Sequence, residues 1–190
     1  MTRRNVTDEQ YGQLVRRTSE LVRRVDEGTV PFDETMNGLQ MLIEESTKRQ
    51  TFKVLVDYVK SLREMIQVGK YDWVNDDITS DHLPITGSGQ EEKEITFFHF
   101  NRRISSDGTI AEMEKAGYRP ALVEELLALG AAEKELQKQF PINALGSVWQ
   151  SPRGYRRVPY LVWAGGGRIL SLAWFGGAWD GRWRFAAVRK

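Results

Sequence analysis

The sequence predicts an α+β protein in which a small helical module precedes a domain that ends in a sheet. Two patterns carry this prediction. Apolar residues recur at alternating spacings of three and four through much of residues 1–75, as on one face of a helix. Residues 146–190 instead hold short apolar runs separated by glycines, as in strands joined by tight turns. We therefore expect a helical bundle over 1–75, a linker over 76–93 and a second domain over 94–190.

The composition limits the class of protein. The chain has 190 residues, 41% of them hydrophobic, and a formal net charge of +1, so it can bury one good core and a smaller second one and has no overall charge that attracts nucleic acid or anionic membranes. The absence of cysteine excludes disulfides, thiolate catalysis and cysteine-ligated zinc. No apolar run is long enough to span a bilayer and the first residues lack a signal core. We expect a cytoplasmic protein without membrane contacts.

The first helix is expected to begin at a capping box. Thr7 is followed three residues later by Gln10, so that each side chain can bond the backbone N–H of the other residue. Gly28 is expected to end the helix. Its arginines could contact nucleic acid, but neighbouring acids favour a solvated face. The apolar stripe consists of Tyr11, Leu14, Thr18, Leu21 and Val25, widened by Val15 and Val22.

Two further helices are expected before residue 76. Asp33 is the expected N-cap of one, and a stripe over residues 52–66 that ends at Gly69 predicts the other. Bundles of this kind often serve docking or dimerisation, but the interpretation of the stripes as the bundle's own core is favoured. The second helix would carry Met36, Leu39, Leu42 and Ile43 on one side.

Neither a cofactor nor a metal is expected. The acidic residues between 75 and 90 lack the register of a calcium-binding loop. Asp81 and His82 are adjacent, but His82 and His99 are the only histidines in the chain. A histidine-rich catalytic metal site is therefore excluded.

The second domain is expected to follow the order strand, helix, helix and several short strands. An aromatic and β-branched run predicts a strand at 94–100. Serine caps and a closing glycine predict a helix between 105 and 117, and a second one at 122–129 stopped by Gly130. Strands are then predicted at 169–175 and 183–188.

Two motifs of this domain resemble a known family. The run G-Y-R-P-A-L-V-E-E-L at residues 117–126 is similar to the G-x-R-L-P-T-x-x-E-W segment of proteins with the C-type-lectin-like fold of the formylglycine-generating-enzyme kind. The run R-F-A-A-V-R at 184–189 resembles the G-F-R-L-V-R ending of the same proteins. The resemblance covers about residues 94–190, and it implies a fold in which the first and last strands of the domain pair.

The resemblance implies a binding function rather than the chemistry of that family. The oxidase activity needs cysteines and the related iron-dependent sulfoxide synthases need three histidines, whereas this chain has no cysteine and two histidines. Sugar-binding lectins bind calcium through E-P-N-like and W-N-D motifs, and only the second has a counterpart in this chain, Trp179-Asp180. The closest in type are the variable proteins of diversity-generating retroelements, which place ligand contacts in their last strands and loops.

The contact surface is therefore expected within residues 146–190, which hold five of the six tryptophans and eight basic residues against one acid. In a strand at 169–175, alternate residues from Arg168 to Trp174 share one face, and Ile169 lies on the other, core face. Trp149 and Phe185 are also assigned to the core, and the alternative that most tryptophans are core stays open. The predicted contact residues are Trp163, Arg168, Trp174, Trp179, Asp180 and Arg182.

Three functions compete for this surface. We favour a non-enzymatic protein that binds a protein or another macromolecule through tryptophan and arginine. The alternative is a nucleic-acid-binding protein in which tryptophans stack on bases and arginines neutralise phosphates. An enzyme that uses Asp180 with Arg182 is least favoured, since one acid among eight bases gives no pair of groups with separated pKa values.

Overall fold

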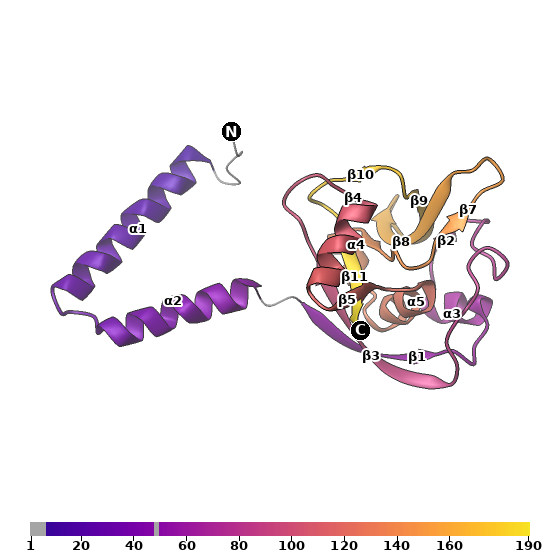
Figure 1. The fold of residues 1–190 in the computed structure, drawn as a ribbon, viewed down its shortest axis with the longest axis horizontal. Helices are drawn as coiled ribbons and strands as arrows, with labels where there is room; N and C mark the ends of the chain where they lie inside the picture. The colour runs from indigo at the N-terminus through magenta and orange to yellow at the C-terminus, as the bar shows by residue number, and fades with distance from the viewer. Residues whose placement is uncertain (1–6, 48–49) are drawn as a thin grey trace. The chain divides into compact units, whose positions relative to one another are not determined.

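The chain divides into two compact units, Met1–Arg49 and Gln50–Lys190, and each is described by itself. The computed structural model (Figure 1) describes the backbone of residues 7–47 and 50–190 and the side chains of 7–39 and 50–190. The predicted mixture of helices and strands is confirmed: the described residues contain six helices and a large mixed sheet.

The N-terminal unit contains helices α1 (Asp8–Asp26) and α2 (Phe32–Thr47). The predicted capping box is confirmed, because Thr7 Oγ1 accepts from the Gln10 N–H at 3.2 Å and Gln10 Oε1 accepts from the Thr7 N–H at 2.9 Å. Gly28 follows the helix with a φ of +69°. α2 begins one residue before Asp33, which therefore lies in the first turn and not at the N-cap. The predicted stripe residues Leu42 and Ile43 have side chains outside the described ones.

The predicted third helix is wrong over its first half, although a helix does end at Gly69 as expected. Strand β1 (Thr51–Asp57) occupies its first half, with Val54 and Val56 buried in alternation, and α3 (Leu62–Gly69) follows. The run T-F-K-V-L-V-D fits a strand through its β-branched residues, and pairing with β3 decides between the two patterns. Ile78 and Leu83 are also buried in the C-terminal unit. The structure therefore places β1, α3 and residues 76–93 in this unit, where the sequence predicts a bundle and a linker.

A mixed sheet of nine strands forms the centre of the C-terminal unit, in the order β1-β3-β11-β6-β8-β9-β2, with β5 also paired to β11 and β7 to β8. Two further short strands, β4 and β10, pair with each other. Besides β1, the strands are β2 (Trp73–Val74), β3 (Gln90–Phe98), β4 (Ile104–Ser105), β5 (Tyr118–Pro120), β6 (Ile142–Asn143), β7 (Trp149–Gln150), β8 (Arg156–Ala164), β9 (Gly167–Trp174), β10 (Ala178–Trp179) and β11 (Arg184–Arg189).

The predicted strands are present, and the first and last of them pair as expected, but the last two are not neighbours in the sheet. The strand predicted at 94–100 is β3, and it pairs antiparallel with the last strand, β11, with Phe98 opposite Phe185. The strands predicted at 169–175 and 183–188 are β9 and β11, and β6 and β8 lie between them in the sheet. β9 instead forms a hairpin with β8 through Gly165 and Gly166, whose φ angles of +60° and +82° favour glycine.

Helices cover both faces of the sheet. Because neighbouring residues of a strand point to opposite faces, Phe97 belongs to one buried cluster, with α3 and α5, and Phe98 to the other, with α4. Figure 1 shows α3 beside α5, as their contacts require. The helices are α4 (Ser106–Lys115), α5 (Val123–Ala132) and α6 (Leu136–Gln139).

Gly130 does not stop α5, which continues to Ala132. A Cβ at this position would lie 2.3 Å from Tyr71 Oη and 2.7 Å from Leu161 Cδ1. The glycine therefore allows α5 to approach these side chains closely, a packing role that the sequence pattern does not reveal.

Candidate functional site

Trp179 belongs to the core, so its prediction as a contact residue is corrected. Its side chain is 4% exposed, and its Nε1–H donates to Ser106 Oγ at 2.9 Å, while that hydroxyl donates to the carbonyl oxygen of Phe175 at 2.6 Å. The physical reason is the pairing of β10 with β4, which sets Trp179 opposite Ile104 and turns the ring inward.

Arg168 is also buried, at 7% exposed. Its guanidinium donates to the carbonyl oxygens of Gly69 and Gly130 and, through Nε at 3.2 Å, to Gln137 Oε1. Its Cζ lies 4.9 Å from the centre of the Tyr71 ring. Gly69 ends α3 and Gly130 lies in the last turn of α5, where helix dipoles place partial negative charge. Arg168 therefore joins two helix ends to β9 and is corrected from a contact residue to a structural one.

In the first half of β9 the two faces are assigned in the opposite sense to the prediction, whereas Trp174 at its end is exposed as expected. Leu170, expected beside Arg168 on the contact face, is fully buried, whereas Ile169 is only half-buried. The alternation is as expected, but α3 and α5 cover the face that the sequence assigned to solvent. Phe185 is buried as predicted, and Trp149 is half-buried against the same core as Leu170.

The other predicted contact residues include two that line one hollow, which we call the aromatic–basic groove. It has a volume of about 350 Å³ and lies where α6, β8 and the segment before β11 come together. Trp163 and Arg182 line it, and Asp180 adjoins it through Arg182. The side chains that define it are Lys138, Phe140, Tyr160, Trp163, Arg182 and Trp183.

The aromatic rings of the groove support one another. The centres of the Tyr160 and Trp183 rings are 5.3 Å apart, and Trp183 rests edge-on against the buried Trp179 at 4.7 Å. Trp163 is 37% exposed, and Lys138 Nζ lies 4.9 Å from its ring centre. Rings held by this packing form a preorganised surface, which loses little conformational freedom when it binds a ligand.

The two cations of the groove are paired with carboxylates that lie outside its lining. Arg182 donates from Nη2 to Asp180 Oδ2 at 2.8 Å, and the hydrogen bonds from Arg182 to this carboxylate hold the pKa of Asp180 below its usual value. Lys138 Nζ lies 2.8 Å from Glu135 Oε2. The Arg184 guanidinium lies 4.7 Å from the centre of the Phe140 ring, and burial lowers its pKa. Among the residues that line the hollow there are two cations and no carboxylate.

Sequence reasoning missed Lys138, Phe140 and Tyr160. Lys138 and Phe140 reach the groove because Gln137 of α6 donates to the carbonyl oxygen of Val162 at 2.7 Å, a contact between segments 25 positions apart. Tyr160 lies in the same strand-like run as the predicted contact residue Trp163, and this shared run was the one feature of the sequence that could have identified it.

Trp174 lies away from this groove. It is 60% exposed and lines a second hollow of about 390 Å³ with Tyr155, Arg157 and Leu172. Along the β8–β9 hairpin Trp174 pairs with Arg157, and Trp163 pairs with Arg168 at the other end. At about 3.3 Å per residue the two tryptophans are roughly 20 Å apart. They therefore do not form one small site.

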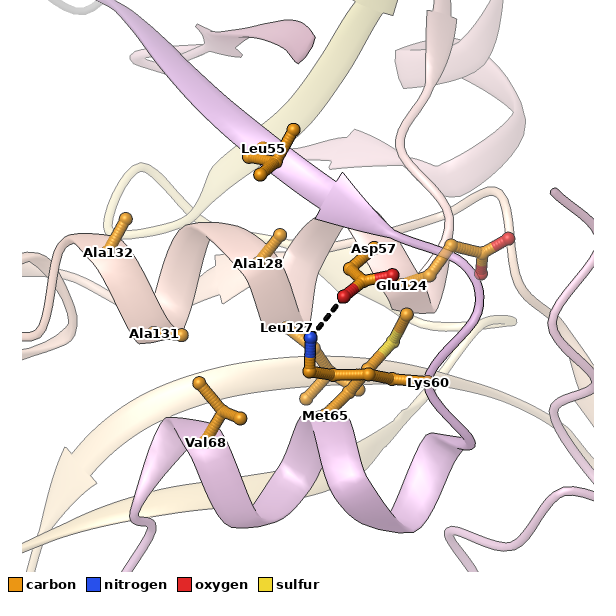
Figure 2. Close-up of a pocket in the computed structure, with 10 residues that line it drawn as sticks. All are labelled: Leu55, Asp57, Lys60, Met65, Val68, Glu124, Leu127, Ala128, Ala131 and Ala132. Carbon is orange, nitrogen blue, oxygen red and sulfur yellow. Dashed lines mark hydrogen bonds and ion pairs between the residues drawn. The ribbon is translucent and has the colours of Figure 1, made fainter. Parts of the chain in front are cut away.

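A third hollow lies between β1, α3 and α5 and is mainly apolar (Figure 2). Its volume is about 330 Å³, with Leu55 and Val68 at its rims and alanines of α5 along one side. Lys60 pairs with Asp57 at one end and holds the pKa of that carboxyl below its usual value. The Glu124 carboxylate points away from the alanines in Figure 2 and accepts hydrogen bonds from Thr86.

Both histidines have structural contacts. The His82 ring stacks on Trp149 with centres 4.2 Å apart, and its Nδ1 lies 2.8 Å from the carbonyl oxygen of Asp77. His99 Nε2 lies 2.8 Å from the carbonyl oxygen of Gly181. Within residues 7–47 and 50–190, no three side chains of the metal-binding types form a cluster, and no helix is long and apolar enough to cross a bilayer.

The motif at residues 117–126 forms a partly buried ion pair. Arg119 donates from Nη1 to Glu125 Oε2 at 2.9 Å and from Nη2 to Oε1 at 2.5 Å, and Glu125 is fully buried. The same carboxylate accepts the Leu122 N–H at 2.8 Å. The pair therefore ties β5 to the first turn of α5.

Comparisons with protein-family models, curated proteins and solved structures find no match to this chain.

Proposed function

We propose that this is a non-enzymatic binding protein that holds a protein ligand in the aromatic–basic groove. One observation carries the proposal: Phe140, Tyr160, Trp163 and Trp183, from three separate segments, line one hollow whose lining also holds two cations and no carboxylate. Tryptophan, tyrosine and arginine are the residues most enriched at the energetic centres of protein interfaces. A ligand segment that combines an apolar or aromatic side chain with carboxylates fits this chemistry.

A protein ligand is favoured over nucleic acid because of the surroundings of Trp163. Binding of single strands relies on aromatic faces that are open to stacking bases. Lys138 covers a face of the Trp163 ring, and Trp183 packs edge-on against Trp179. These contacts leave the rings better suited to side-chain contacts than to base stacking.

The proposal includes a fold assignment for residues 94–190. The resemblance of two motifs to the C-type-lectin-like fold of the formylglycine-generating-enzyme kind is supported by the Arg119–Glu125 pair and by the pairing of β3 with β11. Within that fold we place the chain nearest in type to the variable proteins of diversity-generating retroelements. The location proposed is the cytoplasm, in keeping with a chain that lacks cysteine.

The test is a selection of peptides from a random displayed library on the immobilised full chain. We expect enriched peptides with acidic residues next to apolar or aromatic ones. Trp163→Ala should weaken their binding by on the order of 2 kcal/mol, or about 30-fold, as truncation of a central interface tryptophan typically does.

The control is Trp174→Ala, which removes an equally large exposed ring outside the groove and should bind the peptides as the wild type does. Failure to enrich any peptide, or equal losses in both variants, would contradict the proposal. Tight binding of a fluorescent single-stranded oligonucleotide that weakens steeply with salt would favour the nucleic-acid alternative.

A further inference from the structure

Helix α1 carries an apolar stripe that is exposed over most of its length and half-buried at Leu21 and Val25. Leu14, Val15 and Val22 are 57%, 43% and 68% exposed, and no residue of α1 is buried. In the described part of α2, Phe32 and Met36 are likewise 63% and 48% exposed. Most helical stability in proteins comes from packing an apolar face rather than from the intrinsic propensity of the residues.

The stripe has the spacing of a helix-to-helix seam. Its members recur at intervals of three and four, which is the repeat of a coiled coil. Val15 and Val22 widen the seam on one side only, which suits contact with more than one neighbouring helix. The seam positions are Tyr11, Leu14, Thr18, Leu21 and Val25.

The two flanks of the stripe carry opposite charges. With a turn of about 100° per residue, Arg17 and Arg24 lie on one flank, and Asp8 and Asp26 lie on the other. Two antiparallel copies would bring like flanks together, arginine against arginine. Two parallel copies bring the basic flank of one helix to the acidic flank of the next.

Parallel copies in register also bring opposite charges to nearly the same height. Arg24 and Asp26 differ in height by about 3 Å along the axis, so the basic flank of one helix and the acidic flank of its neighbour carry these two charges at almost the same level. Among the described residues Asp26 takes part in no ion pair, whereas Arg24 Nε lies 2.9 Å from Glu20 Oε1 of its own helix. The acidic flank therefore has charge to offer a second chain.

We propose that α1 is a self-association helix, which forms a parallel, in-register bundle with copies of this chain. The occupant of the exposed stripe is thus the same stripe of another copy. This inference is independent of the ligand groove, since it concerns only the N-terminal unit.

The first test is sedimentation velocity of the full chain over a range of concentrations. The wild type should sediment as a multiple of 21.8 kDa at high concentration and dissociate on dilution. The double variant Leu14→Glu/Val22→Glu should sediment as a monomer. Arg16→Glu changes the net charge by the same amount on the opposite side of the helix, and should assemble as the wild type does.

A wild type that is monomeric throughout would overturn the proposal. A double variant that remains assembled would do the same, because the contact would then lie elsewhere. If a different protein or α2 covers the stripe, the full chain by itself will be monomeric, so these alternatives give the first of these two outcomes.

The second test concerns orientation. Since the chain has no cysteine, Leu21→Cys introduces a single thiol at the seam, and mild oxidation should link two chains in the parallel arrangement. In an antiparallel pair centred on Thr18, position 21 would face position 15 and no link would form.

Charge reversal gives an independent readout of the same arrangement. Arg24→Glu should weaken self-association about tenfold, and Arg24→Glu combined with Asp26→Arg should restore it. Failure of the second substitution to restore assembly would refute the proposed pairing.

Discussion

Replacement of the buried Arg168 by methionine should destabilise the C-terminal unit strongly. Methionine nearly fills the same space, so the main effect is the loss of the hydrogen bonds that the guanidinium donates to Gly69, Gly130 and Gln137. A buried acceptor without a partner costs about 1–3 kcal/mol. The three losses are not additive because the groups are neighbours, and the substitution also removes the cost of burying a charge. We therefore expect the free energy of unfolding to fall by about 3–5 kcal/mol in total.

Urea unfolding followed by tryptophan fluorescence measures this loss, because all six tryptophans lie in the C-terminal unit. In a thermal melt it corresponds to a decrease in Tm of roughly 10–15 °C. Arg168→Lys keeps the charge but cannot reach both helix ends with one amine, and should recover only part of the stability.

The matched control is Arg182→Met, another arginine from the same region, whose side chain is 81% exposed. It should leave unfolding nearly unchanged and weaken ligand binding in the groove. The reasoning would be refuted if Arg168→Met unfolded like the wild type and lost ligand binding instead.

Trp179→Ala should lower the free energy of unfolding by about 3–5 kcal/mol, since the ring is buried against Ser106, whereas Trp174→Ala should melt near the wild-type temperature. Equal melting of the two variants would contradict the core assignment. Lys60→Met should raise the pKa of Asp57 toward its usual value in a carboxyl NMR titration, because the Lys60 hydrogen bond is the main cause of the lowered pKa. A lowered folded pKa gives a stabilisation that is fully present above the unfolded pKa of about 4 and is lost as the pH falls through the folded pKa. The two proteins should therefore differ in stability at neutral pH and converge once the pH lies below the folded pKa of Asp57. An unchanged Asp57 pKa in the variant would show that another group lowers it.

The elements that could be predicted from the sequence are those with local signals. Thr7 and Ser105 mark the starts of α1 and α4 through their own side-chain hydrogen bonds, and glycines bound β9. β1 could not be predicted, since its apolar residues fit a helical stripe as well, and the partner that decides, β3, lies some forty residues away.

The candidate site could be predicted only in part, for the same physical reason. Residue type identified Trp163 and Arg182 as candidate contacts, but it does not predict which aromatic rings point into the core. The direction of Trp179 depends on the pairing of β10 with β4, and the burial of Arg168 depends on where α3 and α5 end. These are tertiary contacts between distant segments, and no local pattern encodes them.

The position of β11 in the sheet determines when the C-terminal unit can fold during synthesis. β11 is the last strand in the chain, yet it lies between β3 and β6 in the sheet order. One edge of β3 therefore stays unpaired until β11 has been synthesised, since Phe98 pairs with Phe185 roughly ninety positions later. While the ribosome makes those positions, the edge of β3 and both buried clusters stay open to other chains. The unit should thus depend on chaperones during translation, and a chain that stops before β11 should aggregate rather than fold.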